Sequence, residues 1–250
     1  MRIALITGAS SGMGKEFVKL AAEEKPGFDE IWVIARREER LACWPDRYPQ
    51  QRFRILPLDL SDGMQMRQLS AVLQEEAPRI DLMVHCAGFG IMGKISEIAV
   101  EEQSGMTKIN CQSVVELTCA VLPYMEPGSR MIYLASAAAF LPQPGFAVYA
   151  ASKAFVLSYV RALRAELKDR GIRVTAVCPG AVKTEFFLRA AANKELPGYK
   201  KLVMADPKKV VRKAMQDAEA DREISVYGIP MKLFHLAAKI LPHRLLLKFV

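Results

Sequence analysis

Two side chains one helical turn apart are the residues best placed to do chemistry. Tyr149 and Lys153 begin and end the run YAASK, so on a helix the phenol and the ammonium share one face. A tyrosine can exchange a proton with a carbonyl or alcohol oxygen, but its unperturbed pKa of about 10 makes it a poor base at neutral pH. A nearby ammonium favours the phenolate and lowers that pKa. Ser136, at the end of a predicted strand, could hold the same oxygen in place.

A glycine-rich turn near the start of the chain has the composition of a phosphate-binding loop. The run TGASSGMG at 7–14 follows a strand-like segment and opens a helical one. Glycine lets the backbone approach a pyrophosphate closely, and a helix N-terminus offers unpaired N–H groups to anionic oxygens. A tight turn without a ligand is the alternative. The residues expected to bind a dinucleotide here are Gly8, Ser10, Ser11, Gly12, Met13 and Gly14.

The end of the second predicted strand indicates which dinucleotide is used. An acidic residue there would bond the ribose 2′-hydroxyl and repel a 2′-phosphate, but this chain has Arg36 and Arg37. Guanidinium groups form charge-assisted, bidentate bonds with phosphate. We therefore expect NADP(H) to be preferred over NAD(H). In the alternative, both arginines belong to a solvated helix start with Glu38 and Glu39.

Two further segments follow predicted strands at the edge where an open α/β sheet binds its ligand. They are Asp59-Leu60 and Cys86-Ala87-Gly88, and we expect all five residues to contact the cofactor. Asp59 could accept a bond from the adenine amino group. Its spacing to Asp62 suits a helix cap equally well.

The elements that must position these residues alternate regularly along the chain. Apolar runs rich in β-branched residues predict buried strands, and amphipathic stretches between them predict helices, as in a doubly wound parallel α/β sheet. We expect one Rossmann-type domain over 1–226, with a basic amphipathic tail at 227–250 as part of it. The segment 182–205 breaks the rhythm and is expected to be a mobile cover over the strand ends, or else an ordinary surface excursion. The predicted strands are Ile3–Ile6, Ile31–Ile34, Phe53–Leu58, Leu82–Val84, Met131–Leu134 and Val174–Val177, and the predicted helices begin near Gly12, Arg37, Asp62, Val100, Val148 and Pro207.

Composition narrows the classes of partner. The chain has 250 residues and a formal charge of +8, so its field favours anions. The sequence has no nucleic-acid-reading motif, and nucleic acid is not an expected partner. The five cysteines form neither a disulfide framework nor a zinc motif, so we expect a reducing compartment and no metal site. The first strand leaves no room for a signal peptide, and a cytoplasmic location is expected.

Taken together, these motifs resemble the short-chain dehydrogenase/reductase family over nearly the full length of the chain. The matching positions are the TGxxxGxG turn at 7–14, Asp59, Asn110, Ser136, Tyr149, Lys153 and Pro179-Gly180. The resemblance implies that Tyr149 is the catalytic acid or base, that Lys153 binds the nicotinamide ribose and tunes Tyr149, and that Ser136 donates to the substrate oxygen. It also implies that Asn110 holds a water in the proton relay.

The resemblance extends to the segment after the sixth predicted strand. Pro179, Gly180, Val182 and Thr184 look like the residues that cradle the nicotinamide. One departure is Cys86, where the family usually has an asparagine that steadies the central sheet, and this puts local stability more in doubt than chemistry. Family members commonly form homodimers or homotetramers through helices that would here span 100–126 and 148–170.

The leading functional hypothesis is transfer of a hydride between NADP(H) and a hydrophobic ketone, aldehyde or alcohol. The alternative is an NADP(H)-binding sensor or membrane-associated interaction protein without turnover. The tail, with Pro242 interrupting its helical pattern, could cap the pocket, pack against another subunit or lie peripherally on an anionic membrane through 229–250. His235 and His243 are expected to be interfacial or surface residues. The residues expected to line the substrate pocket are Phe89, Ile91, Phe140, Leu141, Phe146, Phe186 and Phe187.

Overall fold

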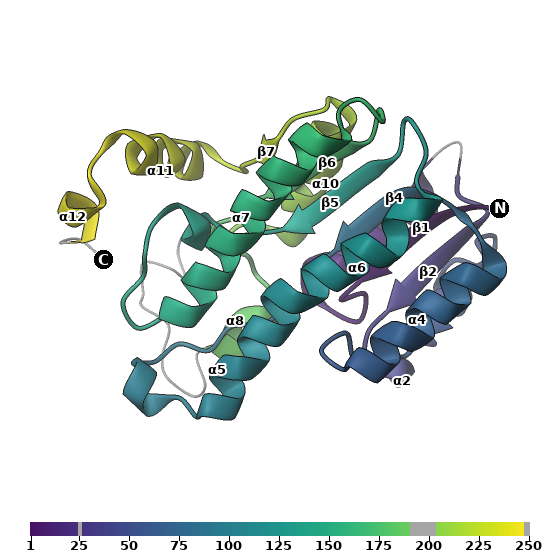
Figure 1. The fold of residues 1–250 in the computed structure, drawn as a ribbon, viewed down its shortest axis with the longest axis horizontal. Helices are drawn as coiled ribbons and strands as arrows, with labels where there is room; N and C mark the ends of the chain where they lie inside the picture. Colours follow the sequence, from purple (N-terminus) through teal and green to yellow (C-terminus); the bar gives the residue numbers. More distant parts are fainter. Residues whose placement is uncertain (25–26, 191–203, 248–250) are drawn as a thin grey trace.

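A seven-stranded, wholly parallel sheet forms the centre of the molecule (Figure 1). The computed structural model describes residues 1–24, 27–190 and 204–247. The strand order is β3-β2-β1-β4-β5-β6-β7, which confirms the predicted doubly wound fold. From β1 the chain adds β2 and β3 on one side, and then β4 to β7 on the other side. The carboxyl ends of β1 and β4 therefore border the crevice where such sheets bind ligands. The strands are β1 Arg2–Thr7, β2 Glu30–Ile34, β3 Phe53–Leu56, β4 Arg79–His85, β5 Arg130–Leu134, β6 Arg173–Val177 and β7 Ile224–Ser225.

Helices cover both faces of this sheet. In β1, Ile3 and Leu5 belong to one buried cluster, while Ala4 and Ile6 belong to the other, as the two-residue period of a strand requires. The first cluster includes residues of α4, α6 and α7, and the second includes residues of α1 and α10. The helices are α1 Gly12–Glu23, α2 Glu38–Leu41, α3 Trp44–Arg47, α4 Gly63–Glu76, α5 Val100–Thr107, α6 Ser113–Val121, α7 Ala147–Leu167, α8 Glu185–Ala190, α10 Pro207–Glu219, α11 Ile229–Ile240 and α12 His243–Leu246.

The long helix α7 shows why the sequence folds in this way. Its residues Val156, Val160, Leu163 and Leu167 recur at intervals of three or four and are all buried. This stripe packs against β6 and β5 and fixes the rotation of the helix about its axis. The same rotation buries Tyr149 and Lys153 one to two turns earlier.

Most predicted strand ends lie within one residue of the observed ones, and three differences are larger. The third strand ends at Leu56 rather than Leu58, because Pro57 has no N–H to donate to a neighbouring strand. The fourth begins at Arg79, three residues earlier than expected. The seventh strand was missed, since the two residues of β7 are too few to show any periodicity and are defined by their pairing with Ala176 and Val177.

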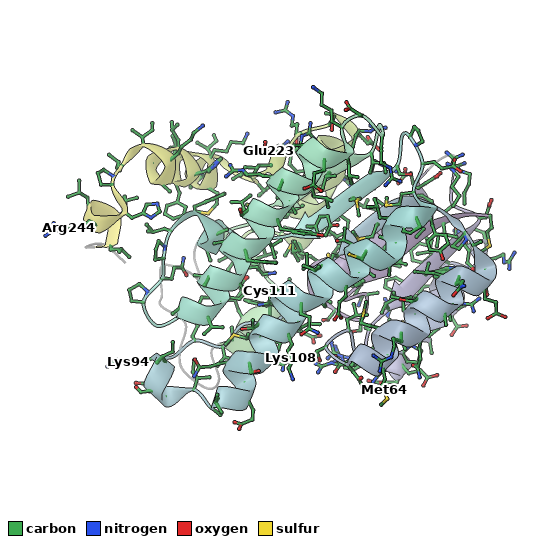
Figure 2. The ribbon with its side chains drawn as sticks, in the orientation of Figure 1. Met64, Lys94, Lys108, Cys111, Glu223 and Arg244 are labelled. Atoms are coloured by element: carbon green, nitrogen blue, oxygen red, sulfur yellow. The ribbon has the colours of Figure 1, made fainter. Side chains whose placement is uncertain are left out.

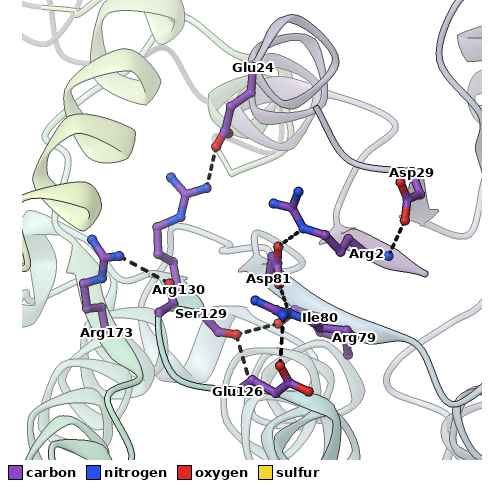
Figure 3. Close-up of polar contacts among 11 residues, drawn as sticks. Arg2, Glu24, Asp29, Arg79, Ile80, Asp81, Glu126, Ser129, Arg130 and Arg173 are labelled. Atoms are coloured by element: carbon purple, nitrogen blue, oxygen red, sulfur yellow. Dashed lines mark hydrogen bonds and ion pairs between the residues drawn. The ribbon is translucent and has the colours of Figure 1, made fainter. Parts of the chain in front are cut away.

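The amino ends of the central strands carry a network of ion pairs (Figure 3). Arginines begin β1, β4, β5 and β6, and Arg130 reaches Glu24 at 2.6 Å. Arg2 and Arg79 share Asp81, at 2.6 and 2.8 Å. The amino-end edge of the sheet lies opposite the ligand-binding crevice, and these arginines are paired there with carboxylates.

Candidate active site

One large cavity opens at the carboxyl ends of the strands. Its volume is about 1010 Å³, at the upper end of the range for small-molecule sites. Of the residues predicted to take part in catalysis or cofactor binding, only Asn110, expected to hold a water, does not line it. The predicted residues that line the cavity are Gly8, Ser10, Ser11, Gly12, Met13, Gly14, Arg36, Arg37, Asp59, Leu60, Cys86, Ala87, Gly88, Ser136, Tyr149, Lys153, Pro179, Gly180, Val182 and Thr184.

The glycine turn presents an uncapped helix N-terminus to this cavity. Gly8 has a φ of +65°, and a Cβ there would lie 2.8 Å from the carbonyl carbon of Cys86, so no other residue fits between β1 and β4. Ser11 is the N-cap of α1, but its side chain makes no capping bond, and the first turn contains no acidic residue. The first N–H groups of α1 are thus available to an anion, as a dinucleotide pyrophosphate requires.

Two arginines line the end of the cavity beside β2. Arg36 lies 3.6 Å from Asp59. Arg37 donates to the Ser10 hydroxyl at 3.1 Å and to Glu185 at 3.4 Å. Both are partly exposed, and Arg37 is the N-cap residue of α2, which begins at Glu38. Their guanidinium groups therefore lie beside the glycine turn, within reach of a ligand in the cavity.

The two roles considered for Asp59 separate in the structure. Asp62, rather than Asp59, caps α4 by accepting from the Met64 N–H. Asp59 instead accepts from the backbone and hydroxyl of Ser61 and lines the cavity. The Thr7 hydroxyl at the end of β1 accepts from the N–H groups of Cys86 and Ala87 at 3.1 Å each, which joins β1 to the segment after β4.

Ser136, Tyr149 and Lys153 converge at the inner wall of the cavity. Ser136 follows β5, while Tyr149 and Lys153 lie on the first two turns of α7. The Lys153 ammonium donates to the Leu134 carbonyl at 2.7 Å and lies 5.8 Å from the centre of the Tyr149 ring. The predicted helical spacing of the phenol and the ammonium therefore brings them to one site.

Burial disfavours the charged form of both groups, the phenolate of Tyr149 and the ammonium of Lys153. It raises the pKa of Tyr149 to about 12, and the neighbouring Ser136 side chain counteracts part of that rise. Burial lowers the pKa of Lys153 to about 8. Without a bound cofactor the tyrosine is thus protonated at neutral pH and able to donate, and additional positive charge at this site would be needed to make it a base.

Asn110 lies in a π-helical turn, Lys108–Gln112, between α5 and α6. Its side-chain amide is fully buried and clamps the backbone of Phe89, accepting from its N–H at 3.1 Å and donating to its carbonyl at 2.9 Å. It also donates to the Ser152 hydroxyl at 3.0 Å. Single π-turns inside α-helices are frequent at functional sites, and this one aims Asn110 at the segment that follows β4.

The outer part of the cavity is apolar. Phe89, Leu141, Phe146, Phe186 and Phe187 line it as predicted. Phe140 and Ile91 do not, and these two predictions are wrong. Phe140 points from its 3₁₀ turn toward the tail and stacks on His235 with ring centres 4.3 Å apart. Ile91 is buried behind the wall in a cluster with Phe146 and Tyr149.

The cavity wall also contains residues that were not predicted, among them Met231, Phe234 and Arg189. Met231 and Phe234 extend from α11 and close one side, so the tail caps the pocket within the chain. The sequence shows the three-residue spacing of Met231 and Phe234 on an amphipathic stretch, but it does not show that this face of the helix points to the cavity. Arg189 of α8 also lines the cavity, 4.3 Å above the centre of the Phe89 ring.

Part of the predicted cover lies over the cavity. α8 contributes Phe186, whose ring centre is 5.3 Å from that of Tyr149. Val182 and Ala205 form a parallel bridge that brings the two ends of the segment together. The remainder of the predicted cover, 191–203, lies outside the described residues.

Comparison with known proteins agrees with this geometry. A model of the short chain dehydrogenase family matches residues 2–195. A sulfoacetaldehyde reductase of Chromohalobacter salexigens is 35% identical over 191 residues, which cover 74% of this chain and 75% of that protein.

Similar solved structures include complexes with both nicotinamide dinucleotides. A short-chain dehydrogenase from Sphingobium yanoikuyae in complex with NADPH has a TM-score of 0.80 at 25% identity, covering 100% of this chain and 96% of its own. A short-chain dehydrogenase/reductase from Burkholderia phymatum in complex with NAD has a TM-score of 0.79 at 22% identity, covering 96% and 94%. The second likeness shows the fold alone.

Proposed function

The chain belongs to the short-chain dehydrogenase family and is an oxidoreductase acting on CH–OH or C=O groups, and from this premise we propose that it uses NADP(H) to reduce hydrophobic ketones or aldehydes, or to run the reverse oxidation. The observation that carries the proposal is the position of Ser136, Tyr149 and Lys153 in the same cavity as Arg36 and Arg37.

The chain's own residues suit NADP(H) at each end of this cavity. The uncapped start of α1 would bind the pyrophosphate, and Arg36 and Arg37 would bind the 2′-phosphate. Asp59 would accept from the adenine amino group. At the other end Cys86-Ala87-Gly88, Pro179-Gly180, Val182 and Thr184 would surround the nicotinamide, which supplies or accepts the hydride.

In carbonyl reduction, Tyr149 would donate its phenolic proton to the substrate oxygen while Ser136 holds that oxygen in place. The raised pKa of Tyr149 keeps the proton on the phenol until the oxygen becomes basic. Lys153 would bind the nicotinamide ribose, and its ammonium would stabilise the phenolate that remains. Asn110 would hold the Phe89 segment in position and order a water next to Lys153, completing the proton path.

The apolar wall favours a hydrophobic substrate. Phe89, Phe146, Phe186 and Phe234 surround the approach to Tyr149, and burying aromatic surface favours apolar ligands.

We also propose a cytoplasmic homodimer or homotetramer assembled through the outer faces of 100–126 and 148–170, where Val100 and Phe155 are exposed. Among the described residues, no helix is long and apolar enough to cross a membrane.

A second substrate class is favoured by Arg189. Its guanidinium lines the cavity against the Phe89 ring, where it could pair with an anionic group on a short aldehyde. The relative from Chromohalobacter salexigens is named a reductase of sulfoacetaldehyde, whose sulfonate is such a group. Arg189→Gln separates the two classes, because only the anionic substrates should lose kcat/KM.

The proposal is tested by turnover and binding of Tyr149→Phe. We expect the variant to retain its affinity for NADPH and to lose nearly all NADPH-dependent reduction of a panel of ketones and aldehydes, about a thousandfold or more, since the proton donor is gone. Fluorescence titration gives the affinity, and NADPH absorbance gives the rate. Unchanged turnover would refute the role of Tyr149, while binding without turnover in the wild type would favour a sensor.

A further inference from the structure

The tail helix α11 is apolar on two opposite faces. Its inner face carries Met231 and Phe234 toward the cavity. Successive residues lie 100° apart around a helix, so a second group falls within about 60° of arc on the outer side. This outer stripe consists of Ile229, Leu233, Leu236 and Ile240, which are 74%, 61%, 53% and 68% exposed.

Nothing in the described part of the chain covers the outer stripe. α11 and α12 stand at one end of the molecule, and some side chains of α11 point away from the rest of the chain (Figure 1, Figure 2). The patch continues beyond α11 through Leu241 and Leu245, which are also exposed. A surface helix normally has one apolar face, which packs on the core, and a second group of exposed large apolar residues on its outer side indicates an interaction surface.

Every charged side chain of the tail itself is positive. No Asp or Glu occurs between Ile224 and Val250, whereas Lys232, Lys239, Arg244 and Lys248 all do. On the helix, Lys232 and Lys239 fall together along one flank of the stripe, and both are exposed. Lysines in that position can bury their methylene chains at an interface and extend the ammonium groups to its polar side.

We propose that α11 and α12 dock this protein onto an anionic lipid surface, with the outer stripe in the acyl region and the lysines at the headgroups. Charge complementarity selects this occupant over a second copy of the chain. In an antiparallel two-fold contact through the stripe, the lysine rows of both copies would lie on the same side, and neither tail has an acidic residue to pair with them. Anionic headgroups supply the missing partners.

Docking would also bring the lipid next to the substrate site. Met231 and Phe234 line the cavity from the inner face of the same helix, so cavity and bilayer would be separated by about one helix diameter, roughly 10 Å. A hydrophobic substrate dissolved in the bilayer would then have a short route to the site. The docking itself does not depend on the proposed reaction, and its test needs no turnover.

The experiment is co-sedimentation of the full chain with vesicles of phosphatidylcholine alone or mixed with phosphatidylserine. The wild type should bind the mixed vesicles more tightly, and added salt should weaken that binding. Lys232→Gln/Lys239→Gln should bind them about 25-fold more weakly, since each basic residue near the surface contributes about fivefold. Leu233→Gln/Ile240→Gln should lose about a hundredfold by withdrawing two apolar side chains.

The matched control is Met64→Gln/Ile95→Gln, which removes two equally exposed apolar side chains outside the tail. Figure 2 places Met64 at the opposite end of the molecule from Arg244 of α12. The control should bind as the wild type does, and circular dichroism should show that all variants are folded. The proposal is overturned if the wild type ignores anionic vesicles, or if Leu233→Gln/Ile240→Gln binds as the control does. Loss of a larger oligomer in Leu233→Gln/Ile240→Gln alone, without vesicle binding by the wild type, would identify a second copy as the occupant.

Discussion

Arg37 and Glu185 are 148 positions apart in the chain but adjacent in the cavity. Glu185 lies 3.4 Å from Arg37 and 2.8 Å from Arg40, and these guanidinium groups, Arg40 first, hold the pKa of its carboxyl below the usual range. The Glu185 carboxylate therefore accepts from Arg37, the arginine proposed to bind a 2′-phosphate, and from Arg40 beside it. Because all three side chains are partly exposed, the ion pairs are weak enough to exchange partners.

The two partners of this ion pair should have opposite effects on NADPH affinity. Arg37→Gln removes a proposed ligand of the 2′-phosphate and should weaken NADPH binding about tenfold, the effect of about 1.4 kcal/mol. Glu185→Gln removes a competing carboxylate and should tighten NADPH binding about threefold. NADH has no 2′-phosphate, so its affinity should change by less than about twofold in either variant. Fluorescence titration at fixed salt measures all four affinities.

Arg52→Gln is the control, since Arg52 is an exposed arginine paired with Glu30 outside the cavity. It should leave both affinities unchanged. If Arg37→Gln and Glu185→Gln both weakened NADPH binding, the ion pair would only stabilise the loop. If Arg37→Gln weakened NADH equally, the assignment to the 2′-phosphate would be wrong.

At the scale of elements, the site depends on how two helices meet. The π-turn Lys108–Gln112 aims Asn110 at Phe89, which follows β4, and at Ser152 on α7. Ser152 in turn donates to the Tyr149 carbonyl at 2.7 Å. The first turns of α7, which carry the reactive phenol, are therefore linked through one buried amide to the strand end that borders the cofactor region.

Asn110→Ala should destabilise the fold as well as the site. It leaves the partly buried Phe89 N–H and carbonyl without the amide and removes the buried bond to Ser152, and each lost hydrogen bond of this kind costs about 1 kcal/mol. We expect the free energy of unfolding to fall by about 3 kcal/mol in urea denaturation.

Gln112→Ala tests whether the effect belongs to Asn110 or to the π-turn in general. Gln112 is an exposed residue of the same turn and donates to Glu116 at 2.8 Å. Its replacement should change the free energy of unfolding by less than about 0.5 kcal/mol. Equal losses in the two variants would mean that the turn itself, rather than the Asn110 amide, determines stability here.

At the scale of the whole molecule, the two edges of the sheet have different tasks. Arginine–carboxylate pairs join the amino ends of the central strands (Figure 3), while the carboxyl ends leave two arginines and a helix N-terminus facing the cavity. At the carboxyl end of β4, His85 is buried, lies 3.2 Å from the Ser113 hydroxyl and stacks on Tyr133. Burial, and secondarily the charge of Lys153, lowers the pKa of His85 to about 3.

Acid should therefore destabilise the protein partly through His85. The unfolded histidine has a pKa of about 6.5, so between pH 6.5 and pH 3 the unfolded state binds one more proton than the folded state. Stability contributed by the neutral imidazole is present above this range and is lost as the pH falls through it. The expected slope is about 1.4 kcal/mol per pH unit, measured as the free energy of unfolding in urea from about pH 6 to pH 4.

His85→Gln should have a flatter profile than the wild type over this range, because the titrating group is absent. His243→Gln, at an exposed position on α12, should keep the wild-type slope. Carboxylates contribute equally to all three proteins, so the difference between profiles isolates His85. Parallel profiles for His85→Gln and the wild type would show that His85 does not limit acid stability.

The sequence by itself determined the alternation of strands and helices, the glycine turn, the adjacency of Tyr149 and Lys153, and the two arginines after β2. These follow from local rules, because a period of two or 3.6 residues, a positive φ and a four-residue helical spacing all lie within a short window. Residues that follow successive parallel strands are brought to one edge by the topology, so their convergence on one cavity could also be expected.

Only the tertiary structure decided how distant segments meet. It turned Phe140 onto His235 and away from the cavity, placed Met231 and Phe234 in the cavity wall, and paired Glu185 with Arg37. A pattern shows that a side chain will be buried but not against which neighbour, because that depends on the packing of elements far apart in the chain. The outer stripe of α11 shows the converse. Its apolar residues suggest burial in the sequence, but the fold leaves them exposed.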